Sequence, residues 1–356
     1  MKAFNKAVIF IIGALFIFSG LVKINDPVGT AIKFEEYFEV FSMDIASFFH
    51  VFVPYALPIA VAFCVLEMVL GVALWVGFKR KGTLLALLGL IVFFTFLTFY
   101  SAYFNKVTDC GCFGDAIPLT PWESFSKDVI LLVLILSLVF QWKQFKNQTN
   151  AFAYGTVALT TILGFGLAFY AIQYLPFIDF RAYKIGNNIP QLMETGIPCR
   201  YVYIVEKDGQ EYEFEEYPTD KSYTYKDMKI LNEKECMPKI TDYNVTTSEG
   251  EDVTQKTFEG KKLLIIVPDV EHTDKEAYSA LTKLVKGLEG TEPMVLTADA
   301  NNFEELRHEV QLAVPYYFAD KTVLKTMVRS NPGVILIEDG TIKGKWHYNS
   351  LSDLLP

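Results

Sequence analysis

The chain has 356 residues and a net charge of −9, and 51% of its residues are hydrophobic. The mean hydropathy of +0.26 is high for a soluble protein of this size and indicates membrane-spanning segments. Of the 41 acidic residues, 31 lie after residue 176, and this acidic second half argues against binding of nucleic acid or docking onto anionic lipid by that half.

Five apolar segments in the first half are long enough, or nearly so, to cross a hydrocarbon core as helices. They cover residues 7–22, 51–78, 83–104, 129–140 with apolar flanks, and 151–178. The first follows two lysines, as the core of a signal peptide would. Its run is long, however, no small-x-small cleavage site follows it, and four more segments come after it. We therefore predict a retained first helix and five spans.

The placement of charged residues orients these helices. If the N-terminus is cytoplasmic, the inside segments hold only bases and the outside loops hold mostly acids, as the positive-inside rule requires. We therefore expect a bacterial inner-membrane protein whose chain after the fifth span lies in the periplasm. The inside bases are Lys2, Lys6, Lys79, Arg80, Lys81, Lys143 and Lys146.

The segment between the first two spans, residues 23–44, is too polar to cross a membrane. Val28, Ile32, Phe38 and Phe41 recur there at near-helical spacing, with glutamates between them. The pattern predicts an amphipathic helix at the outer membrane surface, where it would cover the helix bundle.

After the fifth span the composition becomes that of a folded soluble region. Residues 183–245 alternate polar with β-branched and aromatic residues around an Asp208-Gly209 turn, which predicts a β-hairpin in a small sheet. The last hundred residues follow the order β-α-β-α-β-α-β-β, from a buried strand at 261–269 to a hairpin across Asp339-Gly340. That order predicts a mixed sheet with helices on its faces.

Two cysteines, Cys110 and Cys112, lie one residue apart in the sequence DCGCFGD, between the third and fourth spans. A bond between them would close a small, strained ring, and strain makes a disulfide labile. Gly111 and Gly114 allow the positive φ values that such a ring needs. The pair therefore has the features of an exchangeable disulfide.

Nearby charges act in both directions on these thiols. Lys127 or the N-terminus of the following helix would favour a thiolate, whereas Asp109 and Asp115 would oppose one. Two cysteines without a nearby histidine are too few for a closed zinc site. Redox exchange is the preferred interpretation, and a structural disulfide or a metal site remain alternatives.

The other three cysteines have different surroundings. Cys64 lies inside the second span, where a small apolar thiol is ordinary packing. Cys199 and Cys236 flank the small β-rich region, so a disulfide there would close a loop of about 38 residues and stabilise it by about 3–4 kcal/mol. The alternative is that Cys199 and Cys236 pass electrons to or from the loop thiols.

Glu67 lies near the middle of the second span, where a carboxylate is costly and usually faces the bundle interior. It would either relay a proton during thiol exchange or tie helices together through a partner such as Thr95. Lys23, at the outer end of the first span, is expected to extend its ammonium group to water or to pair with Asp26 or another outer acid.

The tail resembles the thioredoxin superfamily over about residues 255–356. The segment SNPGVILIEDGTIKGKW is similar to the part of that fold in which a cis-proline, here Pro332, precedes the closing hairpin. Where the family has Cys-x-x-Cys after its strand, this chain has PDVEHTDKEA, and no cysteine follows Cys236. The resemblance therefore implies a docking or scaffold domain without the usual thiol chemistry.

The first half resembles the MauE family through DCGCFGD and the following PWESFSKD. FSGLVKINDP and LEMVLGVALWVG are similar to the wider DoxX type of membrane protein. The match covers about residues 1–145 and implies a four-helix membrane domain linked to periplasmic thiol-disulfide chemistry. The arrangement is also similar to vitamin K epoxide reductase and DsbB, which use quinone, but this chain lacks their second cysteine pair within the bundle.

We therefore expect an α-helical membrane bundle followed by a periplasmic α/β domain. Residues 1–146 would form the MauE/DoxX-like four-helix domain and 147–180 a fifth transmembrane helix. A small β-rich linker module would follow in 181–250, and a thioredoxin-like domain without Cys-x-x-Cys in 251–356.

The expected function is periplasmic thiol-disulfide exchange, with Cys110, Cys112, Glu67 and Lys127 as the reacting or assisting residues. The expected partners are a periplasmic protein, docked by the C-terminal domain, and membrane lipid, with no nucleic acid. No cofactor is required by the sequence, although a quinone is left open. The rival hypothesis is an envelope scaffold with a structural CGC turn, and a third is a small-molecule carrier using a pocket around Glu67.

Overall fold

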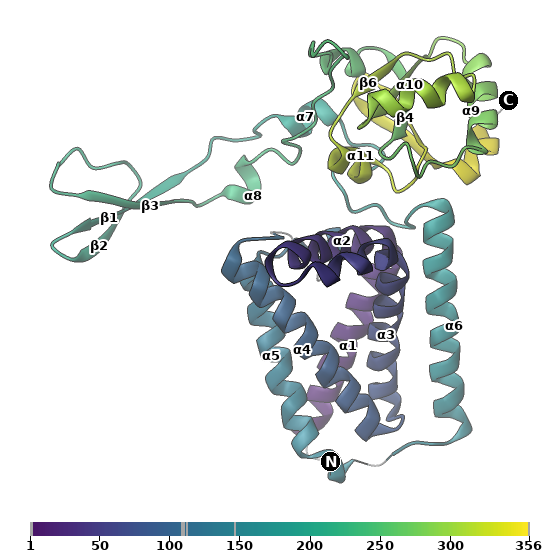
Figure 1. The fold of residues 1–356 in the computed structure, drawn as a ribbon. Helices are drawn as coiled ribbons and strands as arrows, with labels where there is room; N and C mark the ends of the chain where they lie inside the picture. The colour runs from purple at the N-terminus through teal and green to yellow at the C-terminus, as the bar shows by residue number, and fades with distance from the viewer. Residues whose placement is uncertain (1–2, 108–110, 112, 146, 355–356) are drawn as a thin grey trace. The chain divides into compact units, whose positions relative to one another are not determined.

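The computed structural model describes residues 3–107, 111, 113–145 and 147–354 of the chain. The chain divides into two compact units, one of Met1–Arg181 with Trp346–Ser350 and the other of Ala182–Lys345 with Leu351–Pro356. The first unit is helical, and the second contains two β-sheets (Figure 1).

The first unit consists of α1 (Ala3–Asn25), α2 (Pro27–Asp44), α3 (Ala56–Val76), α4 (Arg80–Phe104), α5 (Pro121–Phe140) and α6 (Ala151–Tyr174), with the 3₁₀ turns η1 (Ser47–Tyr55), η2 (Gly114–Ala116) and η3 (Trp142–Gln144). Figure 1 shows α1, α3, α4 and α5 side by side, with α2 across one end of them and α6 alongside α3. The four central helices share one apolar core, in which Ile12, Leu87 and Ile135 are fully buried. The helix expected after the first span is present as α2.

Four helical segments of the described chain are long and apolar enough to cross a membrane: Ala3–Asn25, Ser47–Val76, Arg80–Phe104 and Ala151–Tyr174. They overlap four of the five predicted spans, although the predictions 51–78 and 151–178 extend past the ends of their helices. The remaining prediction, the fourth span at residues 129–140, lies within α5, whose first two turns carry Glu123, Lys127 and Asp128. These charges leave α5 with a shorter apolar stretch than the other four, although it packs against α4 within the bundle.

Local signals in the sequence explain where three of these helices begin. Asp26 accepts a hydrogen bond from a first-turn amide of α2, just before a proline at the first helical position. Thr120 and Glu123 form a reciprocal capping box at the start of α5. The Asn150 side chain likewise accepts a hydrogen bond from a first-turn amide of α6. Each cap satisfies backbone N–H groups that the helix itself leaves unpaired.

Helices α1 and α3 approach each other closely because glycines face the contact. A Cβ atom added at Gly20 would lie 2.7 Å from the amide nitrogen of Met68, and one at Gly71 would lie 2.8 Å from the carbonyl oxygen of Gly13. Small residues at helix contacts allow such backbone approach in membranes. The glycines therefore set the spacing between α1 and α3.

Replacing Gly71 with alanine is expected to destabilise the first unit by about 1–3 kcal/mol, because the new methyl group meets rigid backbone of α1. The measurement is chemical unfolding of the full chain in detergent. The matched control is Gly89→Ala in α4, where no atom lies within 4 Å of an added Cβ and better helix propensity predicts a neutral or slightly stabilising effect. Equal stability of the two variants would contradict the close packing of α1 on α3.

The second unit begins with a three-stranded antiparallel sheet in the order β2-β1-β3. Its strands are β1 (Tyr201–Lys207), β2 (Gln210–Phe214) and β3 (Thr224–Ile230), with the short helices α7 (Ile189–Met193) before them and α8 (Glu233–Cys236) after them. The predicted hairpin turn is confirmed at Asp208 and Gly209, whose φ angles are 55° and 76°.

A five-stranded sheet in the order β6-β5-β4-β7-β8 follows. Strands β4, β5 and β6 are parallel, and β7 is antiparallel to β4. The predicted element order is confirmed, and the Asn331–Pro332 bond is cis as the resemblance implied. The bounds are η4 (Gln255–Phe258), β4 (Lys261–Val267), α9 (Ala277–Lys286), β5 (Glu292–Thr297), α10 (Ala300–Glu309), β6 (Tyr316–Phe318), α11 (Lys321–Met327), β7 (Gly333–Glu338), β8 (Thr341–His347) and η5 (Tyr348–Leu354).

Candidate functional site

The predicted thiol pair, Cys110 and Cys112, lies outside the described residues, but residues on both sides of Cys112 are described. Gly111 and Gly114 have φ angles of 58° and 51°, so the expected left-handed backbone is confirmed at both glycines. The amide of Gly114 donates a hydrogen bond of 3.0 Å to the carbonyl oxygen of Gly111. The chain therefore turns tightly between Gly111 and Gly114.

Side chains from α1, α2 and α5 hold this turn in place. The Phe113 ring is buried against Phe18 of α1, with 5.7 Å between ring centroids. The Lys127 ammonium of α5 lies 5.1 Å from the centre of the same ring. A Cβ atom at Gly111 would be 3.4 Å from the Cγ atom of Lys33 in α2. Contacts from α1, α2 and α5 thus place the turn over one end of the helix bundle.

Below this turn, Lys23 and Glu67 form a buried ion pair between α1 and α3. The Lys23 Nζ atom is 2.8 Å from the Glu67 carboxylate, and both side chains are less than a tenth exposed. The Ser19 hydroxyl donates to the other carboxylate oxygen at 3.1 Å. The Lys23 ammonium also lies 4.7 Å from the centre of the Phe94 ring in α4.

Two expectations about this pair were wrong. Lys23 does not extend to water, because the residue is only 6% exposed and its ammonium pairs with Glu67. Thr95 is not the partner of Glu67, because its hydroxyl donates to the carbonyl of Ile91 within its own helix. The prediction that Glu67 faces the bundle interior is confirmed, since the residue is 4% exposed.

Lys127 and Asp128 form a second ion pair at the start of α5. The Lys127 Nζ atom lies 2.6 Å from the Asp128 carboxylate, which is almost fully buried. The Thr98 hydroxyl of α4 donates to the other oxygen of that carboxylate at 3.1 Å. Lys127 was predicted to assist the thiols, but its partner Asp128 was not predicted. The sequence did carry a signal for this pair, because the two opposite charges are adjacent and lie directly before an apolar segment.

Both ion pairs line one cavity. Its volume is about 20 Å³, which is room for about one water molecule. A quinone ring is many times larger than one water molecule, so the described residues around this cavity do not fit a quinone. The lining residues are Leu15, Phe16, Ser19, Lys23, Glu67, Ile91, Phe94, Phe113, Lys127, Asp128 and Leu131.

This arrangement joins four helices and the cysteine-containing loop through buried charges. Burial of an ion pair costs several kcal/mol of desolvation per ion, and the pairing and hydrogen bonds only offset this cost. Ionisable groups inside membrane helices usually mark proton or ion pathways. Both carboxylates, each paired with a lysine, therefore border the same small cavity, and Phe113 of the loop forms part of its wall.

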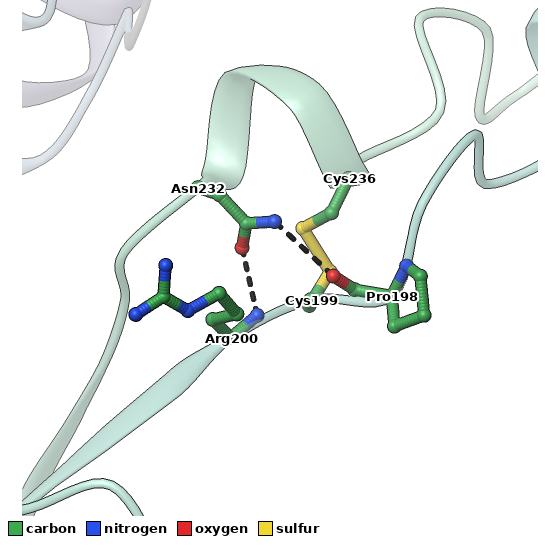
Figure 2. Close-up of a disulfide and its surroundings, with 5 residues drawn as sticks. All are labelled: Pro198, Cys199, Arg200, Asn232 and Cys236. Atoms are coloured by element: carbon green, nitrogen blue, oxygen red, sulfur yellow. Dashed lines mark hydrogen bonds between the residues drawn. A yellow bond between two sulfur atoms is a disulfide. The ribbon is translucent and has the colours of Figure 1, made fainter.

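The structure also describes the other three cysteines of the chain. Cys64 is free and fully buried in α3, as expected for a packing residue. Cys199 and Cys236 form a disulfide, shown in Figure 2. The Asn232 side chain supports the same junction by accepting from the amide of Arg200 and donating to the carbonyl of Pro198. The disulfide and this amide therefore close the base of the three-stranded sheet.

The segment after β4, where the thioredoxin resemblance would place a cysteine pair, holds a charged network. Asp269 accepts from the Lys321 ammonium at 2.7 Å and contacts the His272 ring at 3.1 Å. Burial would raise the pKa of the Asp269 carboxyl, but the hydrogen bonds from Lys321 and His272 lower it to about 2. The Asn331 side chain, next to cis Pro332, donates to the Asp269 carbonyl. This network fixes the loop without supplying a nucleophile.

Metal binding has no support among the residues that the structure describes. No group of three or more His, Cys, Asp or Glu side chains in those residues is arranged to hold a metal ion. The ion pairs of the bundle are held by hydrogen bonds from Ser19 and Thr98.

The first unit is therefore a helical membrane domain with two buried ion pairs beneath a cysteine-containing loop. Residues 1–141 match the family of the methylamine utilisation protein MauE, and residues 199–232 match a domain of unknown function, DUF8463. The protein TlpB of Flavobacterium psychrophilum is 28% identical to this chain over 158 residues. That match spans 43% of this chain and 41% of TlpB. The family match and the apolar helices together support insertion of the first unit in a membrane.

Proposed function

We propose that this chain is a bacterial inner-membrane protein that supports periplasmic thiol-disulfide exchange through Cys110 and Cys112. The observation that carries the proposal is the anchoring of Gly111 and Phe113, which flank Cys112, over the cavity with its two buried ion pairs. The match of residues 1–141 to the MauE family includes this loop. The disulfide of the second unit is consistent with an oxidising compartment.

The proposed exchange conserves electrons and atoms between the loop and a partner protein. One loop thiolate attacks a disulfide of the partner, forming a mixed disulfide and releasing a partner thiolate. The second loop thiolate attacks the loop sulfur of the mixed disulfide and releases the second partner thiolate. The loop dithiol is thereby oxidised to a disulfide and the partner disulfide is reduced to a dithiol. The reverse sequence oxidises the partner.

Lys127 and Glu67 have assisting roles in this proposal. The Lys127 ammonium, next to Phe113, favours a thiolate in the loop, although Asp128 balances part of its charge. Glu67 lies on the same cavity as Lys127 and offers a site for the proton that a thiol loses. The reactive sulfurs themselves are supplied by Cys110 and Cys112.

We keep α5 as the fourth of five spans, and with five spans the second unit would lie on the same side of the membrane as the loop. Of the twelve residues of α5 after Asp128, all but Ser137 are apolar, and the two charges before them pair with each other. The second unit, with its thioredoxin-like element order and without a cysteine after Cys236, then positions the partner. The charged network at Asp269 suits docking, because it holds the loop after β4 against the cis-proline segment.

The test traps the mixed disulfide in cells that express the full chain. Cys110→Ala and Cys112→Ala are compared with wild type after acid quenching and alkylation with a maleimide tag, on non-reducing gels. The expected result is that one single variant accumulates a reductant-sensitive adduct, because its resolving thiol is gone, and that the double variant accumulates none. The Cys64→Ser variant is the control, since its buried thiol takes no part.

The scaffold hypothesis makes the opposite prediction in the same experiment. If Cys110 and Cys112 stay fully oxidised in wild type and neither single variant forms an adduct, the loop is a structural clip. The absence of any cysteine after Cys236 favours a docking role for the second unit under either hypothesis.

A further inference from the structure

A second cavity lies at the opposite end of the bundle, between the start of α4 and the end of α5. Its volume is about 420 Å³, within the range of small-molecule sites. It is lined by two lysines, one tryptophan and a set of apolar side chains: Lys81, Leu84, Leu85, Val139, Phe140, Trp142 and Lys143.

The polar part of this cavity is built around Trp142. The Lys81 ammonium lies 4.9 Å from the centre of a Trp142 ring, and the Lys143 ammonium lies 5.9 Å from one. Both lysines are exposed. The sequence stretches that form this end of the bundle, residues 3–7, 77–82 and 141–150, contain no acid. The cavity is therefore positive at its mouth, with no carboxylate nearby in sequence to neutralise it.

The turn that carries Trp142 is held firmly by its neighbours. The Gln141 side chain accepts a hydrogen bond from Asn5 of α1 at 3.0 Å and donates to the carbonyl of Ser137 in α5. Phe145, just after the η3 turn, is buried in the apolar core of the bundle. The position of Trp142 and Lys143 is thus fixed from both sides.

The apolar part of the cavity continues onto the outer face of the helices. The Phe140 side chain is 83% exposed and Leu85 is 48% exposed, at the end of helices that otherwise pack in an apolar core. Such side chains suit an acyl chain, and lysines beside a tryptophan suit a negatively charged headgroup at the membrane surface.

We propose that this cavity binds an anionic phospholipid, with its phosphate between Lys81 and Lys143 and its acyl chains along Leu85, Val139 and Phe140. A free phosphate ion shares the headgroup chemistry but would leave the apolar wall unused. The lipid is favoured because the charged and apolar parts of the cavity adjoin. The site is independent of the thiol loop, which lies at the other end of α4 and α5.

The test measures quenching of tryptophan fluorescence by brominated lipids in the full chain reconstituted in nanodiscs. Brominated phosphatidylglycerol is expected to quench more strongly than brominated phosphatidylcholine, and the difference is expected to vanish in Trp142→Phe. The double variant Lys81→Gln/Lys143→Gln is expected to weaken the preference for phosphatidylglycerol about 30-fold.

The matched control is Lys6→Gln/Lys79→Gln, which removes the same charge from the same end without touching the cavity. It is expected to leave the preference unchanged, and a circular dichroism melt verifies that every variant is folded. Equal loss in both double variants would overturn the proposal, because it would indicate general surface charge. Displacement of the lipid signal by inorganic phosphate at matched concentration would also overturn it in favour of a phosphate site.

Discussion

Replacing Glu67 with alanine is expected to lower the free energy of unfolding of the membrane domain by about 3–5 kcal/mol. The substitution leaves the Lys23 ammonium buried without its 2.8 Å partner, and the Phe94 ring offsets only part of that cost. The measurement is chemical unfolding of the full chain in detergent. The same loss is expected for Lys23→Ala, since a lone buried carboxylate is equally unfavourable.

The control for this prediction is the double variant Lys23→Met/Glu67→Met. Because it removes both charges and keeps the volume, it is expected to be more stable than either single variant. The exposed pair of Lys33 and Glu36 gives a second comparison, and Glu36→Ala is expected to cost less than about 1 kcal/mol. A Glu67→Ala variant no less stable than Glu36→Ala would show that the buried pair does not tie α1 to α3.

Removing the disulfide by Cys199→Ser/Cys236→Ser is expected to destabilise the three-stranded sheet by about 4 kcal/mol, because the bond closes a loop with a sequence separation of 37 residues. Most of this sheet is exposed on β2 and β3, so little apolar burial replaces the lost constraint. Hydrogen exchange is the measurement, with amides of β1 expected to exchange up to roughly 10³-fold faster.

The five-stranded sheet supplies the internal control for this second prediction. Its central strand β4 is almost wholly buried, and exchange of its amides is expected to remain unchanged. Cys64→Ser, which alters a thiol outside the disulfide, is expected to leave β1 protected. Protection of β1 that survives loss of the disulfide would mean that Asn232 and the strand pairing hold the sheet without it.

Periodicity predicted most of the fold, because it depends on local sequence. The order of strands and helices after residue 260 follows from alternating and helical apolar patterns, and the structure has the same order. The number of membrane spans was harder to predict, because charged residues shorten the apolar stretch of α5. Asp128 and Lys127 lie inside α5 at a point where the sequence suggested a loop edge.

The buried site was only partly predictable, because its contacts depend on how helices pack. Glu67 was identified from its position in an apolar run, but its partner Lys23 is 44 residues away in α1. Whether Glu67 pairs with Lys23 or with Thr95 depends on how α1 is rotated about its axis. It also depends on the close approach of α1 and α3 that Gly20 and Gly71 permit. The burial of Lys23 likewise depends on how the helices pack, whereas α2 itself was predicted from its local apolar pattern.

The two ion pairs beneath the loop also have an electrical consequence. Lys23 with Glu67 and Lys127 with Asp128 sum to zero charge, so as described the site experiences no net force from a transmembrane voltage. Removing one partner of either pair by mutation would leave a net charge at the site. The energy of a charge changes by about 2.3 kcal/mol per 100 mV for a complete crossing of a membrane, so only such a variant would make the site sensitive to voltage.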